Sequence, residues 1–210
     1  MSKVYETGHA KNVANFETLI SFVSGYGAAY NPSLASIKLN ALQAKAAAAN
    51  AVMKQFNELL AATNNAIGAR AIAFEPLKKL STKIGNALKA TDTIAPIIAN
   101  METLNRKMQG KRATAKTTTE ANALQSPATQ ISVAQLSFDN LLDTFQKQIE
   151  LLNSLPQYAP NEPELQVGTL QALYTSLKTL NVAVVANQTN TSNGRLARNE
   201  IMYHPETGLI

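Results

Sequence analysis

The sequence predicts an all-α protein, an up-and-down bundle of about five long helices. Apolar residues recur three and four positions apart through most of the chain, which is the period of helices packed against one another. Hydrophobic residues make up 45% of the 210 residues, as in folded rather than disordered chains. A chain of this length can bury one core, so we expect a single domain over residues 1–210.

The first helix is predicted around residues 16–30. Its apolar stripe consists of Phe16, Ile20, Val23, Gly27 and Tyr30. Three small residues also lie one turn apart and would let another helix approach closely: Ser21, Gly25 and Ala29. Gly25 and Gly27 lack the preceding strand and the third glycine of a phosphate-binding loop, so helix packing is the favoured interpretation.

The second helix is predicted to run from Pro32 to Asn64. Asn31 can cap it, and Pro32 suits the first turn, where its missing N–H costs nothing. The stripe from Leu39 to Ile67 steps by three and four without a miss. Ala46 and Ala49 lie within it, so we expect a neighbouring helix to pack closely there.

The third helix is predicted over residues 76–109. Pro96 removes a backbone donor and clashes with the preceding turn, so it should kink or split this helix near Thr93. The segment 110–129 is rich in Gly, Thr, Ser and Pro and is predicted to be a linker.

The fourth helix is predicted over residues 131–155 and the fifth over residues 163–190. Their apolar stripes again step by three and four, for example from Phe138 through Leu142 to Phe145. The sequence after Asn190 begins with turn-forming residues and is predicted to leave the helix.

An internal duplication is predicted from two halves, 12–109 and 130–210. Pro32 aligns with Pro163 and starts more than twenty residues of matching apolar register. An Ile-x-aromatic-x-Pro sequence follows each long helix and ends at Pro76 and Pro205. The third helix then lacks a counterpart, or its copy would begin after Ile210.

Positive charge is concentrated in residues 70–116. This basic segment holds ten basic and three acidic residues, a net charge of +7, whereas the whole chain carries +5. Such a cluster could bind nucleic acid, anionic lipid or acidic glycan without sequence specificity. A solvated face, or one neutralised by acids elsewhere, is the alternative. The candidate residues are Lys78, Lys79, Lys83, Arg106, Lys107, Lys111 and Arg112.

The chemistry of catalysis is poorly represented. The chain has no Cys, and its two histidines, His9 and His204, lie near the termini. No nucleotide-binding, metalloprotease or calcium-binding motif is present. We therefore expect no enzyme, no catalytic or metal-ligating residue and no cofactor.

The composition favours an interaction protein. Charged residues make up only 16%, and a surface of Asn, Thr, Gln and Ala is easily desolvated against a neighbour. We expect a homo-oligomer or a protein partner. A membrane-active helical protein and a nonspecific polyanion binder are the alternatives. No signal peptide and no transmembrane segment is evident, and neither a cytoplasmic nor a released extracellular location is favoured.

Overall fold

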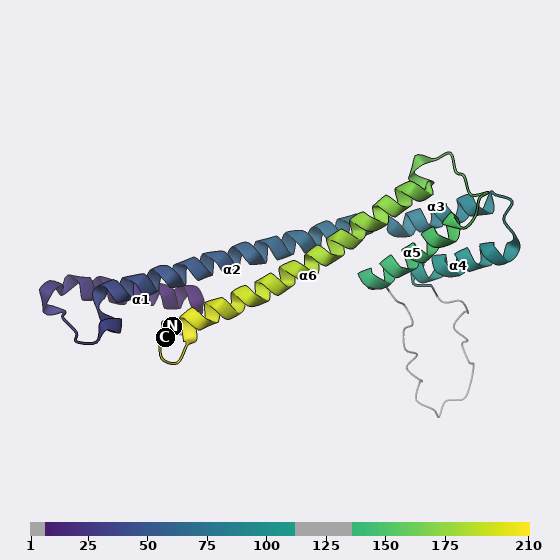
Figure 1. Cartoon of the computed structure of the whole chain (residues 1–210). Coiled ribbons are helices and arrows are strands. Elements are labelled where there is room, and N and C mark those ends of the chain that lie inside the picture. The colour runs from purple at the N-terminus through teal and green to yellow at the C-terminus, as the bar shows by residue number, and fades with distance from the viewer. Residues whose placement is uncertain (1–6, 112–135) are drawn as a thin grey trace, which may run out of the picture. The chain divides into compact units, whose positions relative to one another are not determined.

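The computed structural model describes residues 7–111 and 136–210 and confirms the all-α prediction (Figure 1). Within these residues the secondary structure is helical, with no strand. The α-helices are α1 (His9–Gly25), α2 (Leu39–Phe74), α3 (Leu77–Lys89), α4 (Ala95–Gln109), α5 (Phe138–Asn153) and α6 (Val167–Tyr203). Three short 3-10 helices are η1 (Gly27–Ala29), η2 (Ala35–Ile37) and η3 (Pro163–Leu165).

The chain divides into two compact units. Unit 1 comprises residues 1–67 and 184–210, and unit 2 comprises residues 68–183. Each unit therefore contains part of α2 and part of α6. This division does not follow the predicted halves, 12–109 and 130–210.

Unit 1 contains α1 and an antiparallel pairing of α2 with α6. The buried hydroxyls of Thr63 and Thr191 lie 2.7 Å apart, and each also lies within hydrogen-bond distance of a carbonyl of the opposite helix. Since each hydroxyl has one proton, one of them donates to the other and the second donates to a carbonyl. A Cβ on Gly194 would lie 2.6 Å from Leu59 Cδ1, so a larger residue there would need the leucine to move. Hydroxyls and a small residue thus allow close contact in place of a large apolar seam.

Unit 2 holds the larger hydrophobic core. Helix α4 packs against both α3 and α5, and Figure 1 shows these three helices grouped together. Fully buried side chains come from α3, α4, α5 and α6, and they include Phe145, Leu77, Ile84, Met108 and Leu177. Their spacing follows the helical stripes predicted from the sequence.

Both long helices differ from their predicted bounds. Helix α2 begins at Leu39 rather than Pro32, because residues 35–37 form the separate 3-10 turn η2. It ends at Phe74, beyond the predicted end at Asn64, and α6 ends at Tyr203, beyond the predicted end at Asn190. Two of the turn-forming residues after Asn190 contact α2: Thr191 is hydrogen-bonded to it, and Gly194 lies close to Leu59. These contacts favour the helix where local preference alone would not.

The predicted split at Pro96 is confirmed. Helix α3 ends at Lys89, and α4 begins at Ala95 with the proline in its first turn, where no N–H is needed. Helix α4 ends at Gln109, and Gly110 has φ 68° and forms its left-handed C-cap. Residues 112–129 of the predicted linker 110–129 and the predicted first residues of the fourth helix, 131–135, lie outside the described residues.

Candidate interaction surface

Helix α1 is anchored by one face near the end of α6. Val13 is buried against Ala49 of α2 and Met202 of α6, and Leu209 packs beside them. His9 Nδ1 lies 2.6 Å from the hydroxyl of Tyr203. Because these contacts fix one side of α1, its remaining sides are presented to solvent.

An apolar surface is exposed on α1 and on the connection to α2. We call Leu19, Phe22, Tyr26, Leu34 and Ile37 the apolar surface of unit 1. Their exposed fractions are 50%, 65%, 63%, 62% and 42%. These five large apolar side chains are all exposed and lie within residues 19–37. Clustered exposed apolar side chains are typical of interaction sites, whereas isolated ones are ordinary.

The same segment carries no charge. No Asp, Glu, Lys, Arg or His occurs between Glu17 and Lys38. The helical spacing of its apolar and small residues predicts packing within the bundle, so the surface was not predicted from the sequence. The run without charge was the signal that could have identified it, because exposed segments normally carry charged residues.

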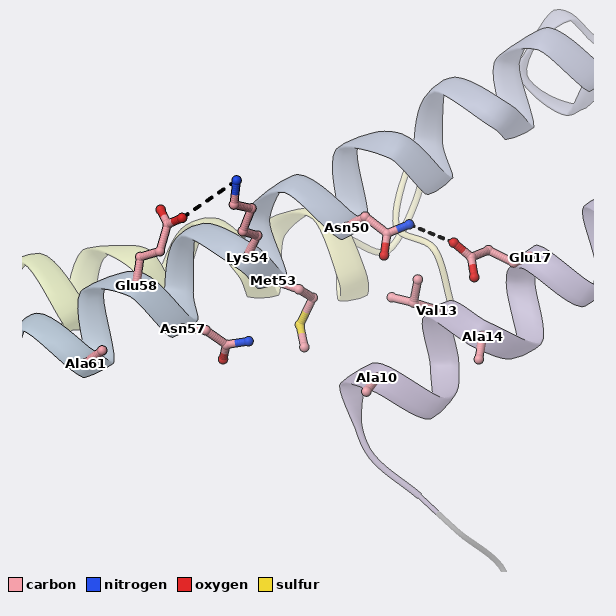
Figure 2. Close-up of a pocket in the computed structure, with 10 residues that line it drawn as sticks. All are labelled: Ala10, Val13, Ala14, Glu17, Asn50, Met53, Lys54, Asn57, Glu58 and Ala61. Carbon is pink, nitrogen blue, oxygen red and sulfur yellow. Dashed lines mark hydrogen bonds and ion pairs between the residues drawn. The ribbon is translucent and has the colours of Figure 1, made fainter.

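An open hollow of about 640 Å³ lies between α1 and α2 in unit 1 (Figure 2). Its lining includes the three alanines Ala10, Ala14 and Ala61, with Val13 and Met53 at the centre. Glu17 accepts a 2.7 Å hydrogen bond from Asn50 across it, and Lys54 and Glu58 form an exposed ion pair at 3.8 Å. These four polar side chains therefore contact one another in pairs, and Asn57 also lines the hollow.

The α1–α2 connection has a close counterpart in the α5–α6 connection. The hydroxyl of Tyr30 donates to the carbonyl of Ile37 at 2.6 Å, and that of Tyr158 donates to the carbonyl of Leu165 at 3.1 Å. In each case the acceptor is the last residue of a 3-10 turn, η2 or η3, which directly precedes the long helix. The Tyr30–Pro32 and Tyr158–Pro160 junctions therefore close in the same way in both units.

The first residue of each short helix also meets an equivalent aromatic ring. His9 begins α1 and contacts Tyr203, the last residue of α6, with ring centroids 5.5 Å apart. Phe138 begins α5 and contacts Phe74, the last residue of α2, with centroids 4.8 Å apart. The guanidinium of Arg70 lies 4.1 Å from the Phe138 ring centroid, within cation–π distance.

The ring contacts align the first residues of α1 and α5, whereas the tyrosine match is offset by one further residue. Counted from their first residues, the two short helices differ mainly in what covers them. Starting both helices together pairs Leu19 with Gln148 and Tyr26 with Leu155. In unit 2, Gln148 is fully buried and Leu155 is 8% exposed. The polar residue is covered in unit 2, while the apolar residues at the matching positions of unit 1 are not.

The buried side-chain NH2 group of Gln148 is hydrogen-bonded within a polar cluster formed by α3, α4 and α5. The Gln148 side-chain amide donates to Ser81 Oγ at 2.8 Å and to Asn105 Oδ1 at 2.6 Å, and Ser81 donates to the same Asn105 oxygen at 2.5 Å. Gly85 leaves the room that the Asn105 side chain occupies. This cluster specifies how the α3–α4 hairpin sits on α5.

The predicted close-packing positions fall into two groups. Ala46 and Ala49 are buried in α2, with exposed fractions of 8% and 0%. Ser21, Gly25 and Ala29 are exposed, and a Cβ built on Gly25 meets no atom within 4 Å. Ala29 lies in η1 rather than in α1. Helix crossing at these three residues thus occurs nowhere within the described chain.

The predicted basic residues lie on the α3–α4 hairpin and its end, but some have local partners. Lys83 pairs with Glu164 at 2.6 Å. Arg106 donates to Thr103 Oγ1 at 2.7 Å. Lys79, Lys107 and Lys111 are exposed and form no ion pair with another described residue, and Lys78 is half-buried. Arg112 lies outside the described residues.

Neither histidine is placed for metal binding. His204 Nδ1 accepts from the backbone N–H groups of Glu206 and Thr207 at 3.2 Å, and His9 is engaged with Tyr203. Across residues 7–111 and 136–210, no three His, Asp or Glu side chains form a group that could hold a metal ion. The helices in the same ranges include none with both the length and the apolar character to span a membrane.

Comparison with known proteins adds no assignment, since no family model, no curated protein and no solved structure matches the chain.

Proposed function

We propose that the protein is a non-enzymatic interaction protein, a helical bundle that self-associates or docks on a partner. The observation that carries this proposal is the exposed apolar surface of unit 1, Leu19, Phe22, Tyr26, Leu34 and Ile37. It combines two exposed aromatic rings with aliphatic side chains in a segment without charge. Interface centres show the same enrichment in aromatic residues and depletion of charge.

The internal duplication belongs to the same proposal. We propose that the α1–α2 and α5–α6 connections derive from one repeated unit. The matching Tyr hydroxyl hydrogen bonds and the matching ring contacts support this. They favour pairing Pro32 with Pro160, three residues earlier than the predicted pairing with Pro163. The repeat gives two similar frameworks, only one of which has its outer face covered.

The proposed function is tested by the mass of the complex that contains the protein in an extract of its source cells. We expect a mass above the 22.5 kDa of the chain, falling towards that value when Phe22 is replaced by lysine. A lysine at this position adds charge to the apolar surface without touching the cores. A mass of 22.5 kDa both in the extract and after purification would contradict an interaction role.

Nonspecific polyanion binding is a second candidate function. The exposed cations Lys79, Lys107 and Lys111 favour it, since they have no ion-pair partner among the described residues. Binding to heparin should then weaken steeply as salt is added, because counterion release drives it. Retention that does not change with salt concentration would count against this mechanism.

A further inference from the structure

We propose that the apolar surface of unit 1 pairs with the same surface of a second copy of this chain. In the resulting two-fold dimer, α1 of each copy covers α1 of the other, as α4 covers α5 within unit 2. This inference rests on the proposed function and names the partner that the function requires.

The first step is to identify which kind of element packs on the outer face of the short helix. In unit 2 α4 packs against α5, and the buried Gln148 of α5 donates to Ser81 of α3 and Asn105 of α4. Thr144 of α5 and Leu155, which follows α5, are also buried. The matching positions are Asn15 and Leu19 of α1 and Tyr26, which follows α1, and all three are exposed. A helix is therefore the cover that this framework is known to accept, and α1 presents the more apolar face of the two.

The second step is that α1 can also act as the cover. Helix α4 faces the core with Met101, Leu104 and Met108, which are spaced by three and then four residues. Leu19, Phe22 and Tyr26 of α1 have the same spacing. Since residues so spaced form one stripe along a helix, two α1 helices can pack stripe to stripe.

The third step is charge. A two-fold interface brings each surface against itself, so any charge near the axis meets an identical charge. The segment between Glu17 and Lys38 has none, and two copies can meet there without repulsion. The α3–α4 hairpin is a poor alternative for self-pairing, because Lys79 and Lys107 are exposed on it and would face their own copies.

The test is the solution mass of the purified full chain, measured by sedimentation equilibrium over a wide concentration range. We expect a reversible dimer of twice 22.5 kDa. Phe22→Lys should raise the dimer dissociation constant by ~100-fold or more, because the substitution enters the interface twice. Leu196→Lys is the matched control: Leu196 is 66% exposed on α6 in the same unit, and its substitution should leave the dimer unchanged.

A covalent version keeps the proposal testable if Phe22→Lys disturbs the fold. The chain contains no cysteine, so a single introduced thiol has only its own copy as partner. Phe22→Cys should form a disulfide-linked dimer under mild oxidation, and Leu196→Cys should not. Circular dichroism of each variant confirms that the helices are retained.

Each other outcome overturns the proposal. A purified chain that stays monomeric at every concentration excludes the second copy, and the proposed function then survives only if the extract still shows a larger complex. A dimer that tolerates Phe22→Lys and forms no disulfide at Phe22→Cys places the interface elsewhere. A monomer that binds neutral phosphatidylcholine vesicles through Phe22 identifies a membrane as the occupant instead.

Discussion

Helices α1 and α5 begin and end in similar local structure, yet the outer face of α5 is buried and that of α1 is exposed. Helix α5 buries Gln148, whose side-chain NH2 group donates to Ser81 and Asn105, while its Oε1 has no hydrogen-bond partner among the described residues. Helix α1 leaves Leu19 half exposed at the matching position. Burial follows the presence of a covering helix, and the polarity of the residue does not predict it. A buried polar group needs hydrogen-bond partners, and an exposed apolar group indicates a missing neighbour.

The hydrophobic core of unit 2 is also larger than that of unit 1. Unit 2 has one continuous cluster of buried Leu, Ile, Met and Phe side chains drawn from five helices. The buried cluster around α1 in unit 1 consists of Val13, Ala49 and Met202. Unit 1 also relies on the hydroxyl contact between Thr63 and Thr191. Substitutions at matched sites should therefore have unequal effects on stability.

The largest difference in the free energy of unfolding is expected between alanine substitutions of two phenylalanines. Phe145→Ala removes a fully buried ring from unit 2 and should lower the free energy of unfolding by about 3–5 kcal/mol. Phe22→Ala removes a ring that is 65% exposed and should change it by at most ~0.5 kcal/mol in the monomer. Urea unfolding followed by circular dichroism measures both. Equal losses would mean that the two faces are equally buried.

Alanine substitutions of two glycines test how firmly the polar cluster is held in place. Gly85→Ala would force its Cβ against Asn105, which hydrogen bonds to Ser81 and Gln148 hold in place, and should cost about 1–3 kcal/mol. Gly68→Ala lies within α2 with no atom near the new Cβ, and should stabilise by about 0.5–1 kcal/mol. Thermal unfolding distinguishes them. Stabilisation by both would show that the Asn105 side chain moves aside easily.

The two junction tyrosines should respond by different amounts. Tyr158→Phe leaves the buried carbonyl of Leu165 without this donor and should cost about 1 kcal/mol. Tyr30→Phe should cost less, because water can reach the partly exposed site and replace the hydroxyl. A larger loss at Tyr30 in urea unfolding would contradict the burial difference.

Tyr158 should also make the free energy of unfolding depend on pH in the alkaline range. Burial, followed by the nearby Glu162 carboxylate, raises the pKa of Tyr158 to about 12 from a usual value of 10.0. Because the folded-state pKa lies above the unfolded one, this contribution to stability is complete below pH 10 and is lost as the pH rises through about 12. Tyr158→Phe should reduce the alkaline loss of stability, whereas Tyr30→Phe serves as the control.

The smallest expected effect is at His9. Burial and then the charge of Arg198 lower the pKa of His9 from its usual 6.5. A lowered folded-state pKa means that the contribution is complete above pH 6.5 and is lost as the pH falls through the folded value. His9→Phe, which copies Phe138 of α5, should remove this dependence. Unfolding curves at pH 7 and at acidic pH that shift equally in both proteins would contradict it.

The sequence predicted much of the helical content but little of its grouping. The stripe of Phe138, Leu142 and Phe145 and the break at Pro96 report local preferences, and both are confirmed. The ends of α2 and α6 were predicted too early, because Asn, Thr, Ser and Gly favour turns when no neighbour is considered. Antiparallel contact at Thr63 and Thr191 supplies hydrogen bonds and close approach that keep these residues helical.

The candidate surface could not be predicted from the sequence for a similar reason. Leu19 and Phe22 lie in a helical stretch where apolar residues ordinarily indicate a core, and no spacing rule tells a covered stripe from an uncovered one.

The amino-acid sequence by itself determined the all-α class, the break at Pro96 and the concentration of positive charge in residues 70–116. Helical periodicity, proline geometry and charge act over a few residues and can be read locally. The tertiary structure decided which short helix is covered, because that depends on where α4 packs. Gln148 is buried and Leu19 is exposed for this reason, although their hydropathies alone would indicate the reverse.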